Sequence, residues 1–469
     1  MALADFLYEK ILSKFRFEPT ECQLQLFKDL AAFAYNGGES DIMVINGYAG
    51  TGKTTAISAF ISAIKERGIR YTLLAPTGRA TKVLSKYSNE RAFTIHKHIY
   101  RQKNLNQGVG EFSLDINKST DRFYIVDEAS LITNYSESSI FGTGDLLDDL
   151  ITYVRQGVNC KLILIGDNAQ LPPVGLDISP ALDLEYLSQY GEIAFSELRS
   201  VVRQAELSGI LHNATILRRE IENYDYDTPK FEKRQFADFE VINSSDLIES
   251  ISTAYDKYGE DETIILCRSN KRANRYNNGI RSTVLFKEER LAKGDKLMIV
   301  KNCYQFLEDC EEVDFIANGD VAYLERISKY QKLYGLEFAQ ATLSFPDYNN
   351  IEIDAKIIID TLFSESPALN SEQQNALFEG VLEDYAHITP KKKRFQMLRE
   401  DKYFNAIQIK YANAITCHKS QGGQWKCVFI DNPFFRDELS IDDKKWLYTA
   451  ITRGVEKVYL VNFPDNYFI

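Results

Sequence analysis

The stretch INGYAGTGKTT, residues 45–55, decides the fold class of this chain. Within it, Gly47 and Gly52 enclose four residues, and Lys53 and Thr54 follow directly. This spacing is typical of a loop whose backbone N–H groups surround the phosphates of a nucleotide. Glycines suit such a loop because they have no Cβ to obstruct the anion. The stretch therefore predicts a nucleotide-binding loop.

The flanking segments fit that prediction. DIMVIN before the loop is a short apolar run that predicts a buried strand. TTAISAFISAIKERG after it has apolar residues at helical spacing and ends at Gly68. A helix that begins at the loop directs its N-terminal dipole at the anion. Strand, loop and helix together predict an α/β nucleotide-binding domain.

Length and composition limit the remaining possibilities. The chain has 469 residues, which predicts several domains, and its 44% apolar and 26% charged content is that of an ordinary globular protein. No apolar run reaches the ~18 residues of a membrane span, so no membrane partner is expected. The segment MALADFLYEKILSKF predicts a docked amphipathic helix, because Asp5 and Glu9 interrupt the apolar run of a secretion signal. A cytoplasmic, nucleoid-associated location is expected.

The charge balance restricts how a nucleic acid could bind. Lys and Arg number 55 and Asp and Glu 67, so the net charge is 55 − 67 = −12. An acidic total opposes non-specific nucleic-acid binding, so any such groove must concentrate its basic groups locally. The seven cysteines are scattered without a CxxC pair, which indicates reduced thiols rather than disulfides or a zinc site.

The order of strand-like and helical segments predicts two α/β domains. From 42 to 170, β-rich runs such as RYTLLAP, RFYIVDEA and CKLILIGD alternate with helical stretches, as in a parallel sheet. A second such series begins near 188, and residues 288–405 interrupt it with a small β-barrel pattern followed by charged helices. The predicted boundaries are 1–100 and 124–187 for the first domain, 101–123 for a hairpin insertion, 188–287 and 406–469 for the second domain, and 288–405 for the barrel and its helices.

Residues after the loop predict the chemistry of ATP and Mg²⁺. Lys53 reaches the β- and γ-phosphates and the Thr54 hydroxyl ligates Mg²⁺. In YIVDEAS, Asp127 would hold Mg²⁺ through water and Glu128 would polarise the attacking water. A carboxylate base favours hydrolysis over phosphoryl transfer to a bound acceptor. In GDNAQLPPV, Gln170 is placed to hydrogen-bond the γ-phosphate or that water.

Two arginines are candidates for stabilising transition-state charge. Arg203 lies in ELRSVVRQ and Arg453 in LYTAITRG, both in the second α/β half. Charge supplied from there would make hydrolysis depend on closure of the two halves. The alternative is that either arginine is an ordinary surface residue.

The ordered motifs together resemble a known family. TECQ, GYAGTGKTT, APTGRA, FTIHKHIY, VDEAS, GDNAQLPPV, ELRSVVRQ, CHKSQGGQW and LYTAITRG occur in the order found in the superfamily 1B DNA helicases of the RecD-like and Dda-like group. The resemblance runs from about residue 18 to the C-terminus and covers residues 288–405 only in outline. It implies two RecA-like P-loop domains, a pin-like hairpin in the first, and an SH3-like barrel with a helical extension in the second. It also implies a monomeric, ATP-driven 5′→3′ motor on single-stranded DNA and at single-strand/duplex junctions, with replication or recombination proteins as possible partners.

The resemblance also assigns roles to residues by position. Gln23 would read the adenine edge, and Gly422 would lie near the phosphates. Phe112 of the hairpin would be the strand-separating wedge, with a packed hairpin aromatic as the alternative. The P-loop contacts would be Gly47, Ala49, Gly50, Thr51, Gly52, Lys53, Thr54 and Thr55. The DNA contacts would be Thr77, His96, Thr416, His418, Lys419 and Gln421.

Two other functions remain open from the sequence. The chain could be the motor subunit of a multi-subunit recombination nuclease, or a nucleic-acid-dependent ATPase that switches without unwinding. A preference for DNA over RNA rests on the family likeness alone, since no residue identifies a reader of the 2′-OH group.

Overall fold

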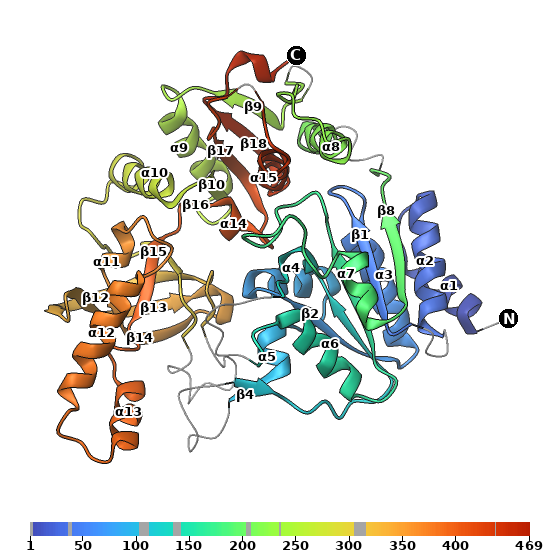
Figure 1. The fold of residues 1–469 in the computed structure, drawn as a ribbon. Coiled ribbons are helices and arrows are strands. Elements are labelled where there is room, and N and C mark those ends of the chain that lie inside the picture. Colours follow the sequence, from blue (N-terminus) through green and yellow to red (C-terminus); the bar gives the residue numbers. More distant parts are fainter. Residues whose placement is uncertain are drawn as a thin grey trace.

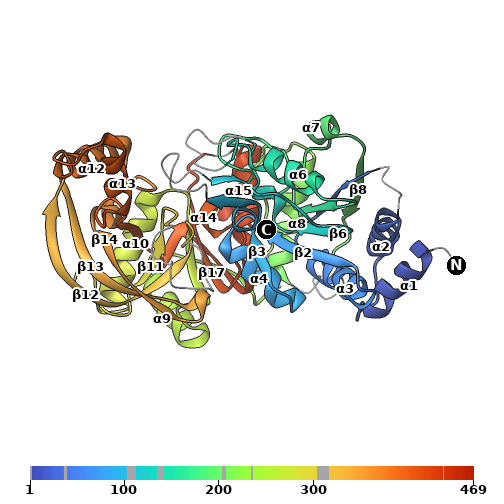
Figure 2. The same ribbon diagram turned by 90° about the horizontal axis from the view of Figure 1, so that it is seen from below.

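The computed structural model describes residues 3–35, 40–102, 112–134, 142–202, 208–233, 236–303, 316–436 and 438–469. Three lobes are visible: two α/β domains, and a barrel with attached helices that lies at the opposite end of the molecule from α1 and α2 (Figures 1 and 2). The predicted fold class, two P-loop-type α/β domains with a barrel inserted in the second, is confirmed. Among the described residues, no helix combines the length and apolarity needed to cross a bilayer.

The first domain is a parallel six-stranded sheet in the order β3-β2-β6-β7-β1-β8. Side chains alternate between its faces, so that Met43 and Ile45 of one strand pack under α1, α2 and α3, whereas Ile42 and Val44 pack under α5 and α6. The strands are β1 (Ile42–Gly47), β2 (Arg70–Ala75), β3 (Ala92–Thr94), β6 (Arg122–Val126), β7 (Lys161–Gly166) and β8 (Ile193–Leu198). The helices are α1 (Leu3–Lys14), α2 (Glu21–Ala34), α3 (Lys53–Glu66), α4 (Gly78–Ser88), α5 (Ile95–Ile99), α6 (Leu146–Gln156) and α7 (Leu184–Leu187).

The first sheet extends beyond the predicted end of its domain. Strand β8 pairs in parallel with β1 along its whole length, although the sequence prediction ends this domain at 187. Strand β6 also begins at Arg122, inside the segment assigned to the hairpin. Pairing between strands distant in sequence decides both boundaries, and a local pattern does not contain that information.

The hairpin insertion forms a two-stranded antiparallel ladder. Strands β4 (Tyr100–Gln102) and β5 (Phe112–Leu114) pair with Tyr100 opposite Leu114 and Gln102 opposite Phe112. Residues 103–111, which connect the two strands of the predicted hairpin, lie outside the described residues.

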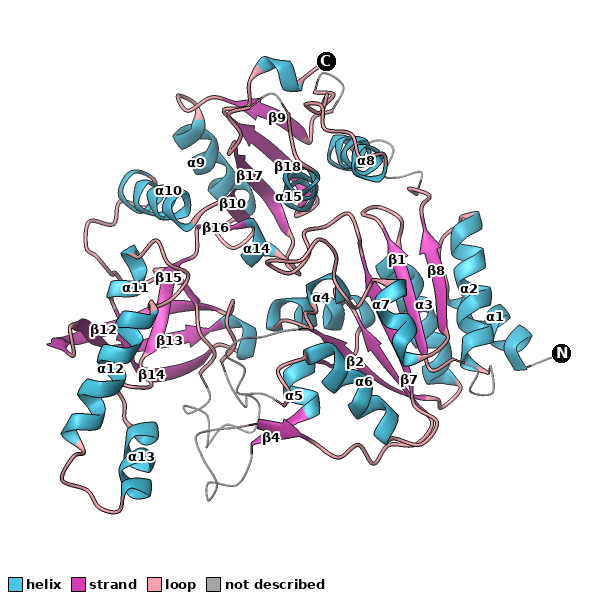
Figure 3. Cartoon of the chain, viewed as in Figure 1, coloured by secondary structure: helices cyan, strands magenta, loops and turns pink. Residues whose placement is uncertain are grey.

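The second domain is a parallel five-stranded sheet in the order β16-β10-β17-β18-β9 (Figure 3). One face packs against α8 and α15 and the other against α9 and α10. The strands are β9 (Phe239–Ile242), β10 (Thr263–Cys267), β16 (Ala414–Thr416), β17 (Trp425–Asp431) and β18 (Gly454–Val461). The helices are α8 (Gly209–Glu222), α9 (Leu247–Tyr258), α10 (Asn270–Thr283), α14 (Cys417–Ser420) and α15 (Ile441–Ile451).

The insertion in the second domain is a closed barrel of β11 to β15. Its last strand follows the helices, so the barrel extends past residue 405, where the sequence prediction ends it. The strands are β11 (Lys296–Ile299), β12 (Val321–Leu333), β13 (Leu336–Phe345), β14 (Ile351–Ile358) and β15 (Ile407–Tyr411). The accompanying helices are α11 (Asp360–Phe363), α12 (Ser371–Asp384) and α13 (Lys391–Glu400), and the last two share an apolar cluster with Leu336 and Phe338 of β13.

Candidate nucleotide site and nucleic-acid cavity

A cavity of about 510 Å³ lies between the two α/β domains. Its walls bring together residues separated by most of the chain, from the P-loop to the turn after α15. The predicted site residues that line it are Ala49, Gly50, Gly52, Lys53, Thr54, Thr55, Asp127, Glu128, Gln170 and Arg453. Predicted site residues of both domains therefore line one cavity.

The P-loop connects β1 to α3 through backbone that only glycine adopts easily. Gly50 and Gly52 have φ of +75° and +77°, which strains any residue with a Cβ. The Lys53 ammonium donates to the carbonyl of Gly47 and, at 3.2 Å, to that of Tyr48. It also lies 3.8 Å from the carboxylate of Asp167. Lys53 is thus held over its own loop, at the wall of the cavity.

The acidic pair follows the end of β6. Glu128 has φ of 55°, and its backbone N–H donates to the Asp127 carboxylate at 2.9 Å. Burial, and next the charge of Glu128, raises the pKa of the Asp127 carboxyl to about 6. Thr54 and Asp127 place a hydroxyl and a carboxylate on the same cavity, and oxygen donors of this kind suit Mg²⁺.

Gln170 carries an unsatisfied polar atom into the site. The residue is 7% exposed, and its Oε1 is buried with no hydrogen-bond partner among the described residues. A buried amide oxygen without a partner is costly, so a group that supplies one is expected at this position. Of the two partners predicted for Gln170, the γ-phosphate and the attacking water, the water can donate to this oxygen.

Arg453 belongs to the second domain and is 3% exposed. Its guanidinium donates to the carbonyls of Thr449 at 3.1 Å and Gly423 at 3.2 Å, which fixes the side chain in the cavity wall. A buried guanidinium with such anchors is unlike the surface arginine that was the alternative. The other candidate, Arg203, lies outside the described residues.

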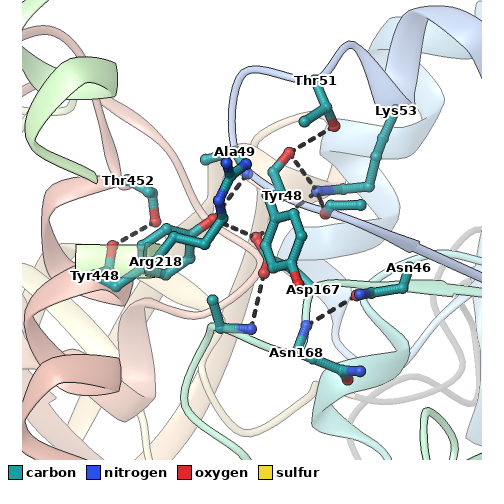
Figure 4. Close-up of polar contacts among 12 residues, drawn as sticks. Asn46, Tyr48, Ala49, Thr51, Lys53, Asp167, Asn168, Arg218, Tyr448 and Thr452 are labelled. Carbon is teal, nitrogen blue, oxygen red and sulfur yellow. Dashed lines mark hydrogen bonds and ion pairs between the residues drawn. The ribbon is translucent and has the colours of Figure 1, made fainter. Parts of the chain in front are cut away.

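The domains also meet through Tyr448 of α15, a residue of the LYTAITRG motif for which no role was predicted (Figure 4). The Ala49 N–H of the P-loop donates to the Tyr448 hydroxyl at 2.8 Å, and that hydroxyl donates to Asp167 at 2.8 Å. Burial, and next Asp167, raises the pKa of Tyr448 well above its ordinary value, so the hydroxyl keeps its proton. No local pattern signals this contact, because 399 residues separate Tyr448 from Ala49.

Three of the predicted nucleotide contacts, Gln23, Gly47 and Thr51, make contacts within or against the P-loop. Gln23 is 1% exposed, closes a capping box with Thr20 at the start of α2, and donates to the Thr51 carbonyl at 2.9 Å. Thr51 is fully buried, and a Cβ on Gly47 would meet the Lys53 side chain at 2.5 Å. Gln23, Gly47 and Thr51 are not among the described residues that line the nucleotide cavity.

A second cavity, of about 280 Å³, lies where both α/β domains meet the barrel. Four of the residues predicted to contact DNA line it: Thr77, His418, Lys419 and Gln421. The Lys419 ammonium donates to the Asn318 side chain at 2.5 Å, and burial lowers the pKa of Lys419 to about 8. The side chain of Gln421 donates to the Leu171 carbonyl at 2.6 Å, and the Leu171 N–H donates to Thr449 at 2.8 Å. Leu171 thus connects this cavity to the helix that precedes Arg453.

The remaining predicted residues lie elsewhere, outside the described linings of both cavities. His96 lies 5.8 Å from the Tyr100 ring, and burial lowers its pKa to about 4. Phe112 packs against the core of the first domain, which favours the packed aromatic over the wedge. Thr416 caps α14 without a side-chain hydrogen bond. A Cβ on Gly422 would meet Ala80 at 2.9 Å, so this glycine allows close contact with α4 of the first domain.

The fold and the site define a P-loop protein whose candidate nucleotide cavity is shared by two α/β domains. The AAA domain family matches residues 30–226, and the UvrD-like helicase C-terminal domain matches residues 411–461. The chain is 24% identical over 458 residues to the ATP-dependent DNA helicase dda of Enterobacteria phage T4, covering 89% of this chain and 94% of the relative. The ATP-dependent RecD2 DNA helicase of Deinococcus radiodurans is 30% identical over 177 residues, which is 37% of this chain and 21% of the relative.

Two further proteins are similar to most of this chain. The uncharacterized protein MJ1519 of Methanocaldococcus jannaschii is 24% identical over 473 residues, covering 89% of this chain and 36% of the relative, so the chain spans about a third of that protein. The solved Pif1 helicase from Bacteroides in complex with ADP-AlF3 and ssDNA aligns over 97% of this chain and 95% of its own, at 17% identity and a TM-score of 0.46. The chain therefore contains an AAA domain and a UvrD-like helicase C-terminal domain, and its sequence is similar to those of the dda and RecD2 DNA helicases.

Proposed function

We propose that this protein is an ATP-dependent DNA helicase that moves 5′→3′ along single-stranded DNA and separates the duplex ahead of it. One observation carries the proposal: Arg453 of the second domain is buried in the wall of the same cavity as Lys53 and Glu128 of the first. Closing and opening of the domains changes the distance between these groups, so hydrolysis and domain motion are linked.

Each residue of the cavity has a role in hydrolysis. Lys53 leaves the loop carbonyls to bind the β- and γ-phosphates. Glu128 accepts a proton from the attacking water, and Gln170 orients that water. Arg453 stabilises the charge that develops on the phosphoryl oxygens. Thr54 and Asp127 would hold Mg²⁺, which neutralises phosphate charge when bound.

Leu171 supports a link from hydrolysis to DNA. Its backbone is held on one side by Gln421, in the second cavity, and on the other by Thr449, whose carbonyl accepts from Arg453. Pro172 and Pro173 follow and restrict the backbone between the two cavities. A shift of α15 against the first domain therefore displaces the walls of the second cavity.

The second cavity is the proposed single-strand site. Lys419 supplies local positive charge in an acidic chain, which favours phosphate contacts and sequence-tolerant, salt-dependent binding. The ligands are single-stranded DNA and single-strand/duplex junctions. We infer that the motor acts as a monomer at the nucleoid, alongside replication or recombination proteins.

Strand displacement tests the proposal. The purified chain is given duplexes with a 5′ or a 3′ single-stranded tail, in DNA and in RNA versions, with ATP and Mg²⁺. We expect separation of the 5′-tailed DNA only, and no separation by Glu128→Gln. Separation of the 3′-tailed DNA contradicts the polarity, and preference for the RNA contradicts the substrate. ATP hydrolysis without separation of any duplex contradicts the helicase function and leaves a DNA-dependent ATPase, or a motor subunit that requires partners.

A further inference from the structure

The hydroxyl of Tyr448 is the acceptor of a P-loop backbone amide. It accepts a hydrogen bond from the Ala49 N–H at 2.8 Å and donates one to the Asp167 carboxylate at 2.8 Å, so it has both an acceptor and a donor partner (Figure 4). Tyr448 is 1% exposed and Asp167 is 1% exposed, which keeps water away from both bonds. The contact joins α15 of the second domain to the loop that surrounds the phosphates.

The same amide is a donor that a nucleotide needs. A P-loop binds phosphate oxygens through successive backbone N–H groups, and Ala49 stands inside the loop and lines the nucleotide cavity. One N–H cannot make two strong, linear hydrogen bonds at once. A phosphate oxygen and the Tyr448 hydroxyl therefore compete for the Ala49 N–H.

Tyr448 is also close in sequence to Arg453, the proposed catalytic arginine. It lies on α15, which ends at Ile451. Arg453 follows two residues later, and its Nε donates to the Thr449 carbonyl at 3.1 Å. The neighbouring Thr449 hydroxyl accepts the Leu171 N–H at 2.8 Å. Release of Tyr448 from the P-loop frees one of the contacts that fix this end of α15 against the first domain.

We propose that Tyr448 is a positioning residue through which the second domain detects the nucleotide: its hydroxyl competes with phosphate for the Ala49 amide, and its displacement releases α15 and Arg453. The proposal rests on the proposed motor function but is tested by binding alone. Tyr448 touches no reacting atom in this role. Its effect is on nucleotide affinity and on the transmission of binding to the second domain.

The test uses Tyr448→Phe, which keeps the ring and removes the hydroxyl. The matched control is Tyr276→Phe, which removes a tyrosine hydroxyl that donates to Asp431 at 2.7 Å within the second domain, away from the described lining of the nucleotide cavity. The dissociation constant of ADP with Mg²⁺ is measured by titration calorimetry on the full chain and both variants. We expect Tyr448→Phe to bind ADP about threefold more tightly or better, because the competitor for one charge-assisted hydrogen bond is gone. Tyr276→Phe should match the unsubstituted chain.

An unchanged or weaker ADP affinity in Tyr448→Phe overturns the proposal. Hydrogen exchange of the unsubstituted chain decides the question if that variant does not fold. Peptides that span Ile441–Ile451 should exchange faster when ADP and Mg²⁺ are added, and unchanged or slower exchange overturns the proposal. A chain that binds ADP as expected but separates no duplex contradicts the helicase function and leaves the role of Tyr448 intact.

Discussion

The guanidinium of Arg79 lies 3.9 Å above the ring of Trp425 and so joins α4 of the first domain to β17 of the second. Each partner lies beside a predicted site residue. Arg79 lines the second cavity beside Thr77, and the Trp425 N–H donates to the Arg453 carbonyl at 2.9 Å. The stack is a second interdomain contact between the proposed DNA site and Arg453, the proposed catalytic arginine.

Arg79→Ala should therefore weaken the stimulation of ATP hydrolysis by DNA. A desolvated cation–π contact contributes ~0.5–2 kcal/mol, so we expect a loss of about fivefold in DNA-stimulated kcat with a smaller loss without DNA. Arg79→Lys keeps the charge but not the planar stack, so its DNA-stimulated kcat should lie between that of the unsubstituted chain and that of Arg79→Ala. Steady-state ATPase with and without a poly(dT) oligonucleotide measures the ratio. Equal losses with and without DNA would show that the stack does not transmit DNA binding.

Glu128→Gln should abolish turnover and spare binding. The amide keeps the shape of the side chain but cannot accept the proton of the attacking water, and such a loss costs ~10²–10⁴-fold in rate. Titration with ADP and with single-stranded DNA should give affinities close to those of the unsubstituted chain. Normal hydrolysis by the variant would mean that another group is the base.

Arg453→Ala should lower kcat far more than it raises the KM for ATP. An arginine that acts on transition-state charge contributes ~10³–10⁵-fold in this class of reaction. Because Arg453 is 3% exposed and anchors to two backbone carbonyls, thermal unfolding of the variant must be compared in parallel. Arg453→Lys preserves the charge and is the control for any loss of stability caused by removing the buried side chain. A kcat that follows only the loss of folded protein contradicts the catalytic assignment.

Affinity for single-stranded DNA should fall as the pH rises through about 8, because burial lowers the pKa of Lys419 to about 8. Below that pH the ammonium is charged and binds phosphate, and above it the free protein has lost the proton that binding requires. One linked proton weakens binding by up to ~tenfold per pH unit. Fluorescence anisotropy at constant ionic strength, from pH 7 to 9, measures this slope.

Lys419→Arg is the control for the pH effect. Arginine stays charged over the whole range, so its slope should be smaller by about one proton. Lys82, whose pKa burial also lowers to about 8, contributes equally to both proteins and cancels in the comparison. Identical slopes for Lys419 and its arginine variant would place the titrating group elsewhere.

The predictions that succeeded are those carried by contiguous residues. The P-loop is specified by Gly50 and Gly52, whose positive φ values need glycine, and by the strand and helix on either side. Asp127 and Glu128 follow a strand of the same domain, and strands that end at one edge of a parallel sheet bring their following residues together. Local sequence was enough for this half of the site because local backbone geometry builds the P-loop, and the alternation of strands and helices predicts the parallel sheet that brings Asp127 and Glu128 near it.

Contacts between distant segments required the tertiary structure. The pairing of β8 with β1, the closure of the barrel by β15, and the close approach of Gly422 to α4 depend on packing between elements remote in sequence. The sequence by itself determined a P-loop, its acidic partners and two α/β domains. Only the tertiary structure placed the Tyr448 hydroxyl on the Ala49 amide, because a hydrogen bond across 399 residues leaves no periodicity or spacing in the chain.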